Sequence, residues 1–296
     1  MGPRDHRPAR TPAAHRPGLR FTLLRYGVIS DIHGNLPALQ AGLAELRRQG
    51  IDGLLCAGDL VGYGPWPNEC VAEIAAENAV CVAGNQDLAV VDRLPDARLS
   101  NHARLILEWT RTVLEPDAAA YLGALPLQAS VEPALTLVHG SIEDPQRYVF
   151  RDEDAAQQLD LLAELDPAAQ TLLLGHTHRA MAYGRRGGMR KLTPREPMPL
   201  AGDRHLLNPG SIGQSRERKP WARLALIDLE HQLVTFYALD YDLEMCRKEL
   251  TRRGLPPGAC HAPPSLISLG HRSVKRVARR ALRSVRRSQG VAGPGV

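Results

Sequence analysis

The chain has 296 residues, of which 44% are hydrophobic, and this is enough for one large domain or two small ones with a substantial core. Its apolar runs fall far short of the about 20 residues that a membrane-spanning helix needs, which excludes a helical membrane protein. The formal net charge is +5, but residues 1–25 carry +5 and residues 262–296 carry +8. The segment between these tails is therefore acidic, with a charge of −8.

Residues 1–25 are rich in arginine and proline and poor in apolar side chains, so we expect a disordered N-terminal extension. This extension lacks the apolar stretch of a secretory signal. The chain has five cysteines, an odd number without metal-site spacing, which favours a reducing cytoplasm over a disulfide framework. They are Cys56, Cys70, Cys81, Cys246 and Cys260.

The first predicted strand covers residues 26–30, and a helix is predicted to follow it. The helix has one apolar stripe, formed by Leu36, Leu39, Leu43 and Leu46. Asn35 is placed to cap the N-terminus of the helix and Gly50 to end it. This unit would hold Asp31 and His33 in the loop between strand and helix.

Four further short apolar runs are typical of buried strands. Together with the first, they are residues 26–30, 53–57, 79–83, 134–138 and 171–174. Each run is followed at once by side chains that can bind a metal, namely Asp31, His33, Asp59, Asn85, His139, His176 and His178. In open α/β sheets, ligands bind beyond the carboxyl ends of the strands, so side chains scattered over roughly 150 positions are predicted to share one site.

A helix beginning near Asn101 is predicted between the third and fourth strands, with His102 in its first turn. After His178 the pattern changes to shorter runs that we expect to form a second sheet. These runs are residues 181–183, 206–207, 224–227 and 233–237. A last helix over about residues 242–253 is expected to close the fold.

We assign residues 26–254 to the catalytic domain and residues 255–296 to a proline-rich linker with a basic C-terminal tail. Within the tail, residues 273–287 place apolar side chains on one helical face and basic ones on the rest. Two interpretations of this tail are possible. The tail forms an amphipathic helix on an anionic membrane surface or on nucleic acid, or it is simply a solvated basic segment.

The set of seven candidate ligands contains carboxylate, amide and imidazole groups but no thiolate, so it suits Mn²⁺, Fe or Zn²⁺ better than a structural zinc site. A carboxylate such as Asp59 can bridge two cations. Two metals about 3.5–4 Å apart would share a hydroxide, lower its pKa towards neutrality and clamp the oxygens of an in-line displacement at phosphorus. The predicted substrate is therefore a phosphate monoester or diester.

These motifs resemble those of the calcineurin-like metallophosphoesterases, and within them the small bacterial phosphodiesterase-like group. The resemblance covers most of residues 26–254. It is carried by Asp31-Ile32-His33, Gly58-Asp59, Gly84-Asn85-Gln86-Asp87, His139-Gly140 and Gly175-His176-Thr177-His178. It continues in residues 59–65, in His139-Gly140-Ser141 and in Asn208-Pro209-Gly210-Ser211.

The resemblance implies an α/β fold: a four-layer α/β/β/α sandwich with two facing mixed sheets. It also implies two divalent metal ions, with Mn²⁺ expected and Fe, Zn²⁺ or Ni²⁺ as alternatives. One metal would be bound by Asp31, His33 and His178 and the other by Asn85, His139 and His176, with Asp59 bridging. Catalysis would fall to Asp59, Asn85 and His178.

The sequence departs from the family pattern at Gln86, where the family commonly has a histidine that acts as a general acid or binds phosphate. Glutamine can donate a hydrogen bond to a phosphoryl oxygen but cannot deliver a proton near pH 7. We therefore expect a preference for diesters or activated leaving groups over alkyl monoesters. His102 could replace the missing acid, or it could simply occupy the first turn of its helix.

Three side chains are candidates for contact with the substrate: Gln86, Asn208 and Arg179. Arg179 could bind a phosphate bidentately, or it could be a solvated arginine at the rim. Asp87 could orient Gln86 or a histidine, or it could cap the following segment. The alternative to an enzyme is a binding scaffold that keeps the fold with little catalysis, but a scaffold would have little need for all seven ligands.

Overall fold

The computed structural model describes residues 25–95, 101–131 and 134–264. Its strands form two six-stranded sheets, here called sheet I and sheet II. In sheet I the order is β3-β2-β1-β11-β12-β9. The first three of these strands run parallel, and the others pair antiparallel. The strands are β1 (Arg25–Ile29), β2 (Gly53–Cys56), β3 (Val80–Cys81), β9 (Pro197–Pro199), β11 (Ala222–Asp228) and β12 (Leu233–Leu239).

Sheet II has the order β4-β5-β6-β10-β7-β8. Its three central strands β5, β6 and β10 are parallel, and antiparallel strands lie on both sides of them. The strands are β4 (Gln128–Val131), β5 (Leu135–Val138), β6 (Thr171–Leu173), β7 (Met181–Gly184), β8 (Gly188–Met189) and β10 (His205–Asn208). Both sheets are thus mixed, as expected.

The prediction that the strands after His178 form a separate second sheet is wrong. β10 joins sheet II beside β6, with β7 on its other side, whereas β11 joins sheet I beside β1, with β12 on its other side. The register of β1 with β11 pairs Gly27 with Leu226 and Val28 with Ala225. Strands buried on both faces carry no periodic signal that distinguishes one sheet from another, so only long-range pairing decides their partners.

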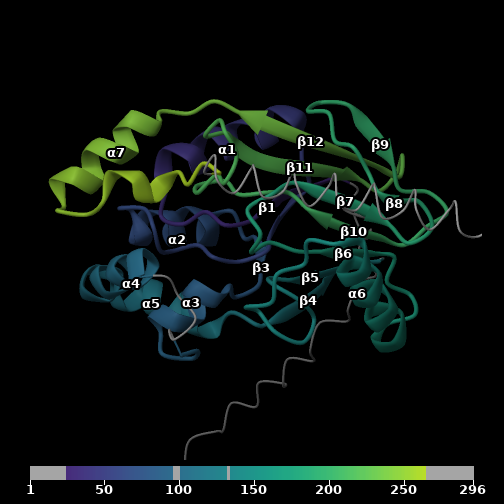
Figure 1. The fold of residues 1–296 in the computed structure, drawn as a ribbon, viewed down its shortest axis with the longest axis horizontal. Coiled ribbons are helices and arrows are strands. Elements are labelled where there is room, and N and C mark those ends of the chain that lie inside the picture. The colour runs from purple at the N-terminus through teal and green to yellow at the C-terminus, as the bar shows by residue number, and fades with distance from the viewer. Residues whose placement is uncertain (1–24, 96–100, 132–133, 265–296) are drawn as a thin grey trace, which may run out of the picture.

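The helices lie outside the two sheets, and Figure 1 shows α6 beside the strands of sheet II and α3, α4 and α5 grouped apart from it. The α-helices are α1 (Leu36–Gln49), α2 (Pro67–Ala76), α3 (Asn85–Val90), α4 (Asn101–Val113), α5 (Pro116–Ala124), α6 (Asp152–Leu165) and α7 (Leu243–Arg252). A 3₁₀-helix, η2, covers Pro257–Cys260. The cap signals predicted for α1 are confirmed, because the Asn35 side chain accepts a hydrogen bond from Ala38 N and Gly50 has φ 69°.

Three hydrophobic clusters show the layers of the sandwich. Val28 of β1 belongs to a cluster between the two sheets, whereas the next residue, Ile29, packs with α1 and α2 on the outer face of sheet I. In β6, Leu173 faces the cluster between the sheets and Leu172 packs with α6. Alternate residues of one strand therefore enter different cores. This arrangement confirms the predicted α/β/β/α sandwich with two facing mixed sheets.

The packed body extends past the predicted domain boundary at residue 254. Leu255 and Cys260 are buried in a cluster with α7 and Trp66, and His261 forms an isolated parallel bridge with Ser215. Burial of these apolar side chains explains why the segment packs instead of forming a linker. Residues 1–24 and 265–296, which include most of the predicted extension and tail, lie outside the described residues. Among the helices that the structure describes, none is long and apolar enough to cross a membrane.

Candidate metal centre

The seven candidate ligands lie at the carboxyl ends of strands from both sheets. Sheet I supplies those that follow β1, β2 and β3, namely Asp31, His33, Asp59 and Asn85. Sheet II supplies those that follow β5 and β6, namely His139, His176 and His178. All seven are buried, with exposed fractions from 0 to 6%. The predicted convergence of the strand ends therefore brings the predicted residues to one place.

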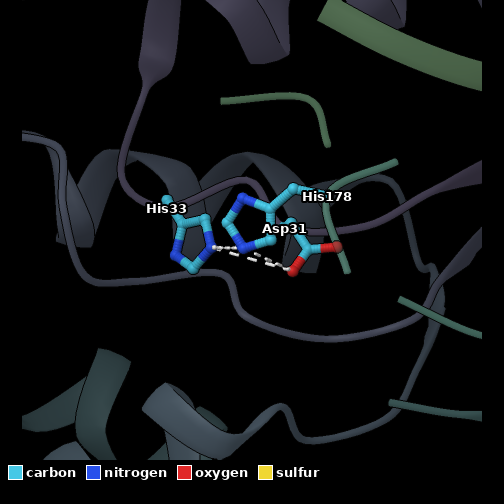
Figure 2. Close-up of side chains that lie close together, drawn as sticks. All are labelled: Asp31, His33 and His178. Carbon is cyan, nitrogen blue, oxygen red and sulfur yellow. Dashed lines mark hydrogen bonds and ion pairs between the residues drawn. The ribbon is translucent and has the colours of Figure 1, made fainter. Parts of the chain in front are cut away.

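Asp31, His33 and His178 form the first group of possible ligands. Figure 2 shows the three side chains turned toward one another. The Nε2 atoms of His33 and His178 are 3.2 Å apart, and His178 Nε2 is 3.3 Å from an oxygen of Asp31. Two imidazole nitrogens and a carboxylate oxygen thus point at one small volume, which is the arrangement of a metal-ligand set.

Hydrogen bonds on the far side of each ring fix which nitrogen carries the proton. His33 Nδ1 lies 3.0 Å from the Val61 carbonyl and His178 Nδ1 lies 2.6 Å from the Gln214 carbonyl. A carbonyl only accepts, so both Nδ1 atoms donate and both Nε2 atoms present lone pairs. Burial lowers the pKa of His33 to about 4 and that of His178 well below its usual value. Two neutral rings with facing lone pairs fit a cation between them.

Asp59, His139 and His176 form the second group. His139 Nδ1 donates to the Ala57 carbonyl at 2.7 Å, and His139 Nε2 lies 3.3 Å from Asp59 Oδ2 and 3.2 Å from Asn85 Oδ1. Asp59 Oδ2 is also 3.8 Å from His33 Nε2 of the first group. Asp59 therefore lies between the two groups, where a bridging carboxylate would have to be.

His176 contributes its other ring nitrogen. Its Nε2 lies 3.1 Å from the Gln146 carbonyl and donates to it, which leaves the lone pair on Nδ1. Burial lowers the pKa of His176 to about 3, so the ring is neutral near pH 7. A neutral imidazole with an available lone pair is the form of histidine that binds a metal.

The two carboxylates have opposite pKa shifts. Burial raises the pKa of Asp31 to about 7. Burial would also raise the pKa of Asp59, but attraction to His139 and a hydrogen bond from it keep that pKa below its usual value. Burial would lower the pKa of His139, but the neighbouring Asp59 carboxylate outweighs it and raises that pKa to about 10. Buried negative charge at this place calls for positive charge, which divalent cations provide.

The backbone at the ligands adopts a conformation that is rare outside glycine. Asp31, His33, Asp59, His176 and His178 have φ values from 53° to 64°. Each such residue costs free energy, and such strain gathers at functional sites where the surroundings enforce it. The left-handed turns let successive side chains after one strand point into the same site.

Asp87 holds one of these strained loops in place. Its carboxylate accepts hydrogen bonds from the backbone N–H groups of Asp59, Leu60 and Val61, at 2.8–3.2 Å, and from Gly84 N at 2.9 Å. Of the two predicted roles, the bond to Gly84 N matches a cap at the start of α3. No bond between Asp87 and Gln86 or a histidine is present among the described residues.

Two glycines bring the backbone close to the ligands. A Cβ atom at Gly84 would lie 2.1 Å from Asp59 Oδ1, and a Cβ atom at Gly175 would lie 2.0 Å from Ser30 Oγ. Gly84 has an ordinary φ of −86°, so the requirement there is for space and not for an unusual conformation. The lack of space for a Cβ atom explains why the Gly84-Asn85 and Gly175-His176 motifs begin with glycine.

Residues 24–206 match the family of calcineurin-like phosphoesterases. This match covers more than half of the chain and includes all seven candidate ligands. The chain belongs to the calcineurin-like phosphoesterases. Membership in this family, together with the two histidine and aspartate groups, indicates a hydrolase that acts on phosphoesters with divalent metals.

Other proteins resemble this calcineurin-like phosphoesterase over most of its length. A metallophosphoesterase from Sphaerobacter thermophilus is 30% identical and has a TM-score of 0.70, with 81% of this chain and 97% of that chain covered. A hypothetical protein from Pyrococcus horikoshii shares the fold at 22% identity and a TM-score of 0.64, over 80% and 96% of the chains. An uncharacterized protein of Methanocaldococcus jannaschii is 29% identical, over 77% of this chain and 93% of its own.

The three predicted substrate contacts take different positions in this phosphoesterase. Gln86 is buried beside the ligands, and its Oε1 has no hydrogen-bond partner within the described residues. Arg179 is partly buried, and its guanidinium lies 6.0 Å from the centre of the Phe150 ring. Asn208 is fully buried, and its amide donates to the Gly175 carbonyl at 2.5 Å. In this structure Asn208 thus positions the loop that carries His176.

Sequence reasoning missed Arg216. Its Nη2 lies 3.2 Å from His178 Nε2, and its Nη1 donates to the Tyr148 hydroxyl at 3.4 Å. It belongs to the charged segment from Arg216 to Lys219, and such a segment is typical of an exposed turn. The clue in the sequence was its place a few residues after the Asn208 turn. The side chain of His102 lies outside the described part of the structure, although α4 begins at Asn101 as predicted.

Proposed function

We propose that this chain is a metal-dependent phosphodiesterase that prefers diesters and activated leaving groups to alkyl monoesters. The observation that carries the proposal is the pair of buried ligand groups with Asp59 between them. The rings of the first group present facing lone pairs, which a cation between them would satisfy. A site of two cations beyond the ends of parallel strands suits displacement at phosphorus.

Asp31, His33 and His178 would hold one metal, and Asn85, His139 and His176 the other, with Asp59 touching both. When bound, these ions supply a nucleophilic hydroxide near neutral pH and neutralise charge on the phosphoryl oxygens. Mn²⁺ suits the mixture of oxygen and nitrogen ligands, and Fe, Zn²⁺ and Ni²⁺ are alternatives.

Arg216 is placed to bind the phosphoryl group. Its guanidinium donates toward the same His178 Nε2 lone pair that a metal ligand offers. With a metal bound at His178, that lone pair would be occupied and the Arg216 donors would be available to a phosphoryl oxygen. A guanidinium suits this role because it stays charged and donates in a fixed fork. The amide of Asn85 can donate to a second phosphoryl oxygen.

Gln86 limits the range of leaving groups. Gln86 is buried beside the candidate ligands, and its backbone N–H donates to Asp59 Oδ1 at 2.8 Å. An amide cannot protonate a leaving alkoxide, and loss of a positioned acid typically costs about 10²–10⁴-fold in rate. The loss is greatest for poor leaving groups, which is the basis of the proposed preference for diesters and aryl esters.

The test is hydrolysis of bis(p-nitrophenyl) phosphate by metal-stripped protein reloaded with Mn²⁺, with p-nitrophenyl phosphate as the monoester comparison. We expect Mn²⁺-dependent turnover that favours the diester. Asp59→Asn is expected to lower it by at least about 100-fold, because it removes the shared ligand. Asp160→Asn, on the exposed face of α6 where it pairs with Arg185, serves as the matched control and should leave turnover unchanged.

Metal content measured in the same samples separates the outcomes. Absence of turnover in protein that holds two Mn²⁺ ions would overturn the proposal and favour a binding scaffold with little catalysis. Hydrolysis of serine phosphate as fast as of the aryl diester would overturn the preference for diesters while leaving the metal chemistry intact.

A further inference from the structure

Two exposed aromatic rings stand beside the second ligand group. Tyr148 and Phe150 are 43% and 47% exposed, and they lie in the loop between β5 and α6. Val149 between them is fully buried in the cluster under α6. The segment is irregular and extended, so the two rings leave it on one side while the valine anchors it on the other.

The rings form a continuous stack that starts on a candidate metal ligand. Tyr148 lies on His176 with 4.1 Å between ring centres and 23° between planes. Phe150 lies next to Tyr148 at 5.2 Å and 6°. Both pairs are stacked, with their ring planes close to parallel. The stack therefore leads from the candidate metal centre to the surface of the molecule.

Two arginines accompany the stack. The guanidinium of Arg216 lies 6.0 Å from the centre of the Tyr148 ring, and that of Arg179 lies 6.0 Å from the centre of the Phe150 ring. Arg216 also reaches His178 of the first group. A ligand that places an anion at the metals and a planar group on the stack would meet favourable partners along its whole length.

The fold does not require these rings to be exposed. The loop is already fixed by Ser141 N and Arg147 N, which donate to the Asp144 carbonyl, and by Ile142 N, which donates to the Gln158 side chain. Its apolar anchor is Val149. Paired aromatic side chains held open to solvent at the edge of a site are the means by which proteins bind planar groups.

We propose that Tyr148 and Phe150 form a subsite for a planar ring in the ester group of the substrate, either an aryl group or a nucleobase. This inference rests on the proposed function and narrows its substrate class. The phosphate would bind at the metals and Arg216, and the ring would extend the stack of Tyr148 and Phe150 that starts at His176. Linear alkyl or sugar phosphodiesters lack the group that this subsite binds.

The test compares ligands that differ only in the ring. Calorimetric titration of Mn²⁺-loaded protein with adenosine 5′-phosphate and with ribose 5-phosphate isolates the contribution of the base. We expect the nucleotide to bind about 10- to 100-fold more tightly, as single stacking contacts do. Phenyl phosphate in the same titration distinguishes the two kinds of ring, because a subsite shaped for aryl groups binds it at least as tightly as the nucleotide.

Phe150→Ala is the decisive variant because Phe150 is exposed and touches none of the candidate ligands directly. It should remove most of the advantage of the nucleotide, and Phe150→Trp, which keeps a planar ring, should retain it. Tyr148 is less suitable because it contacts His176 and Arg216. Kinetically, Phe150→Ala should raise KM for thymidine 5′-(p-nitrophenyl phosphate), whereas Phe150→Trp should leave it close to that of the wild type.

The outcomes separate the subsite from the catalytic proposal. Equal binding of nucleotide and ribose phosphate, or a nucleotide advantage that survives Phe150→Ala, would overturn the subsite even if the diesters are hydrolysed. Failure to hydrolyse any diester with two metals bound would overturn the proposed function, regardless of how tightly the ligands that contain a ring bind.

Discussion

His33 and His178 illustrate how single residues are oriented as candidate ligands in this protein. Each ring is oriented by a backbone carbonyl on its Nδ1 side, Val61 for one and Gln214 for the other. Each sits on a residue with a positive φ, which turns the side chain away from the usual path after a strand. Orientation and protonation are therefore fixed by neighbours before any metal binds, which is the preorganisation that metal sites depend on.

Gly84→Ala tests the close approach of the backbone to Asp59. The added Cβ atom would lie 2.1 Å from Asp59 Oδ1, so either the carboxylate or the backbone must move. We expect the free energy of unfolding to fall by about 1–3 kcal/mol, as for other overpacked sites, together with a loss of Mn²⁺-dependent turnover. Urea denaturation and kcat measure the two effects.

Gly123→Ala provides the control for that substitution. Gly123 lies in α5 with no atom within 4 Å of an added Cβ. Alanine there should be neutral or stabilise the protein by up to about 1 kcal/mol. Equal stability of the Gly84 and Gly123 variants would show that the space around Asp59 is not restrictive.

Gln86→His should widen the range of leaving groups. The imidazole would stand where Gln86 now lies beside the ligands and could deliver a proton to a departing alkoxide. We expect the rate on serine phosphate to rise at least about tenfold, with a smaller change for bis(p-nitrophenyl) phosphate. Gln86→Asn, which shortens the side chain and adds no acid, controls for altered packing. A rise of the same size in both variants would refute the role of the proton.

The helix α1 shows how an element is tied to its surroundings. Leu39, Leu43 and Leu46 are buried on one face, as their spacing predicts. On the other side, Glu45 accepts hydrogen bonds from Arg48 in the same helix at 2.7 Å and from Arg195, which precedes β9, at 3.0 Å. Glu45 thus connects α1 with the edge of sheet I.

Glu45→Gln should destabilise the protein in a manner that depends on pH. Hydrogen bonds from Arg48 lower the pKa of Glu45 from 4.5 to about 2. A lowered pKa contributes stability above the unfolded value of 4.5, and that contribution is lost as pH falls toward about 2. At pH 7 we expect a loss of about 1 kcal/mol after allowance for solvent screening.

The measurement is urea denaturation of wild type and Glu45→Gln across this range of pH. The difference between the two proteins should be largest above pH 5 and should shrink as the carboxylate is protonated. Glu164→Gln, at an exposed position of α6, is the control and should show no such trend. A difference for Glu45→Gln that stays constant from pH 7 to pH 3 would contradict the assignment.

For the whole molecule, the candidate metal centre joins the two sheets. Asp31, His33 and Asp59 come from sheet I, whereas His139, His176 and His178 come from sheet II. Each group in turn contains residues of both sheets. Metal ions bound there would cross-link the two halves of the sandwich, so that metal binding and stability of the entire fold are coupled.

We therefore expect two equivalents of Mn²⁺ to raise the melting temperature by about 5–10 °C, since a ligand at 100 times its Kd adds about 2.7 kcal/mol. Chelation should reverse the change. Acidification should weaken it, because metal binding displaces protons from ligands such as Asp31, whose pKa burial raises to about 7. Calorimetry with metal analysis tests this, and an unchanged melting temperature with two ions bound would contradict the cross-link.

Local patterns in the sequence predicted candidate ligands that the structure brings together, because each follows a short apolar strand, and strand ends in α/β sheets converge. The same patterns could not assign the strands after His178 to a sheet. β11 pairs with β1 and β10 with β6, and such pairings depend on contacts between residues that lie far apart in the sequence. The local sequence of a uniformly apolar strand does not indicate which strand it pairs with.

By itself, the sequence determined the family resemblance, the seven candidate ligands, the absence of the usual acid at Gln86 and the ends of α1. Those features depend on neighbouring residues or on motifs that are visible in the printed chain. Only the tertiary structure decided the places of Arg216, Tyr148 and Phe150. Each lies in a charged or irregular loop without periodicity. Other strands bring His178 into contact with Arg216 and His176 into contact with Tyr148, and Phe150 stacks on Tyr148.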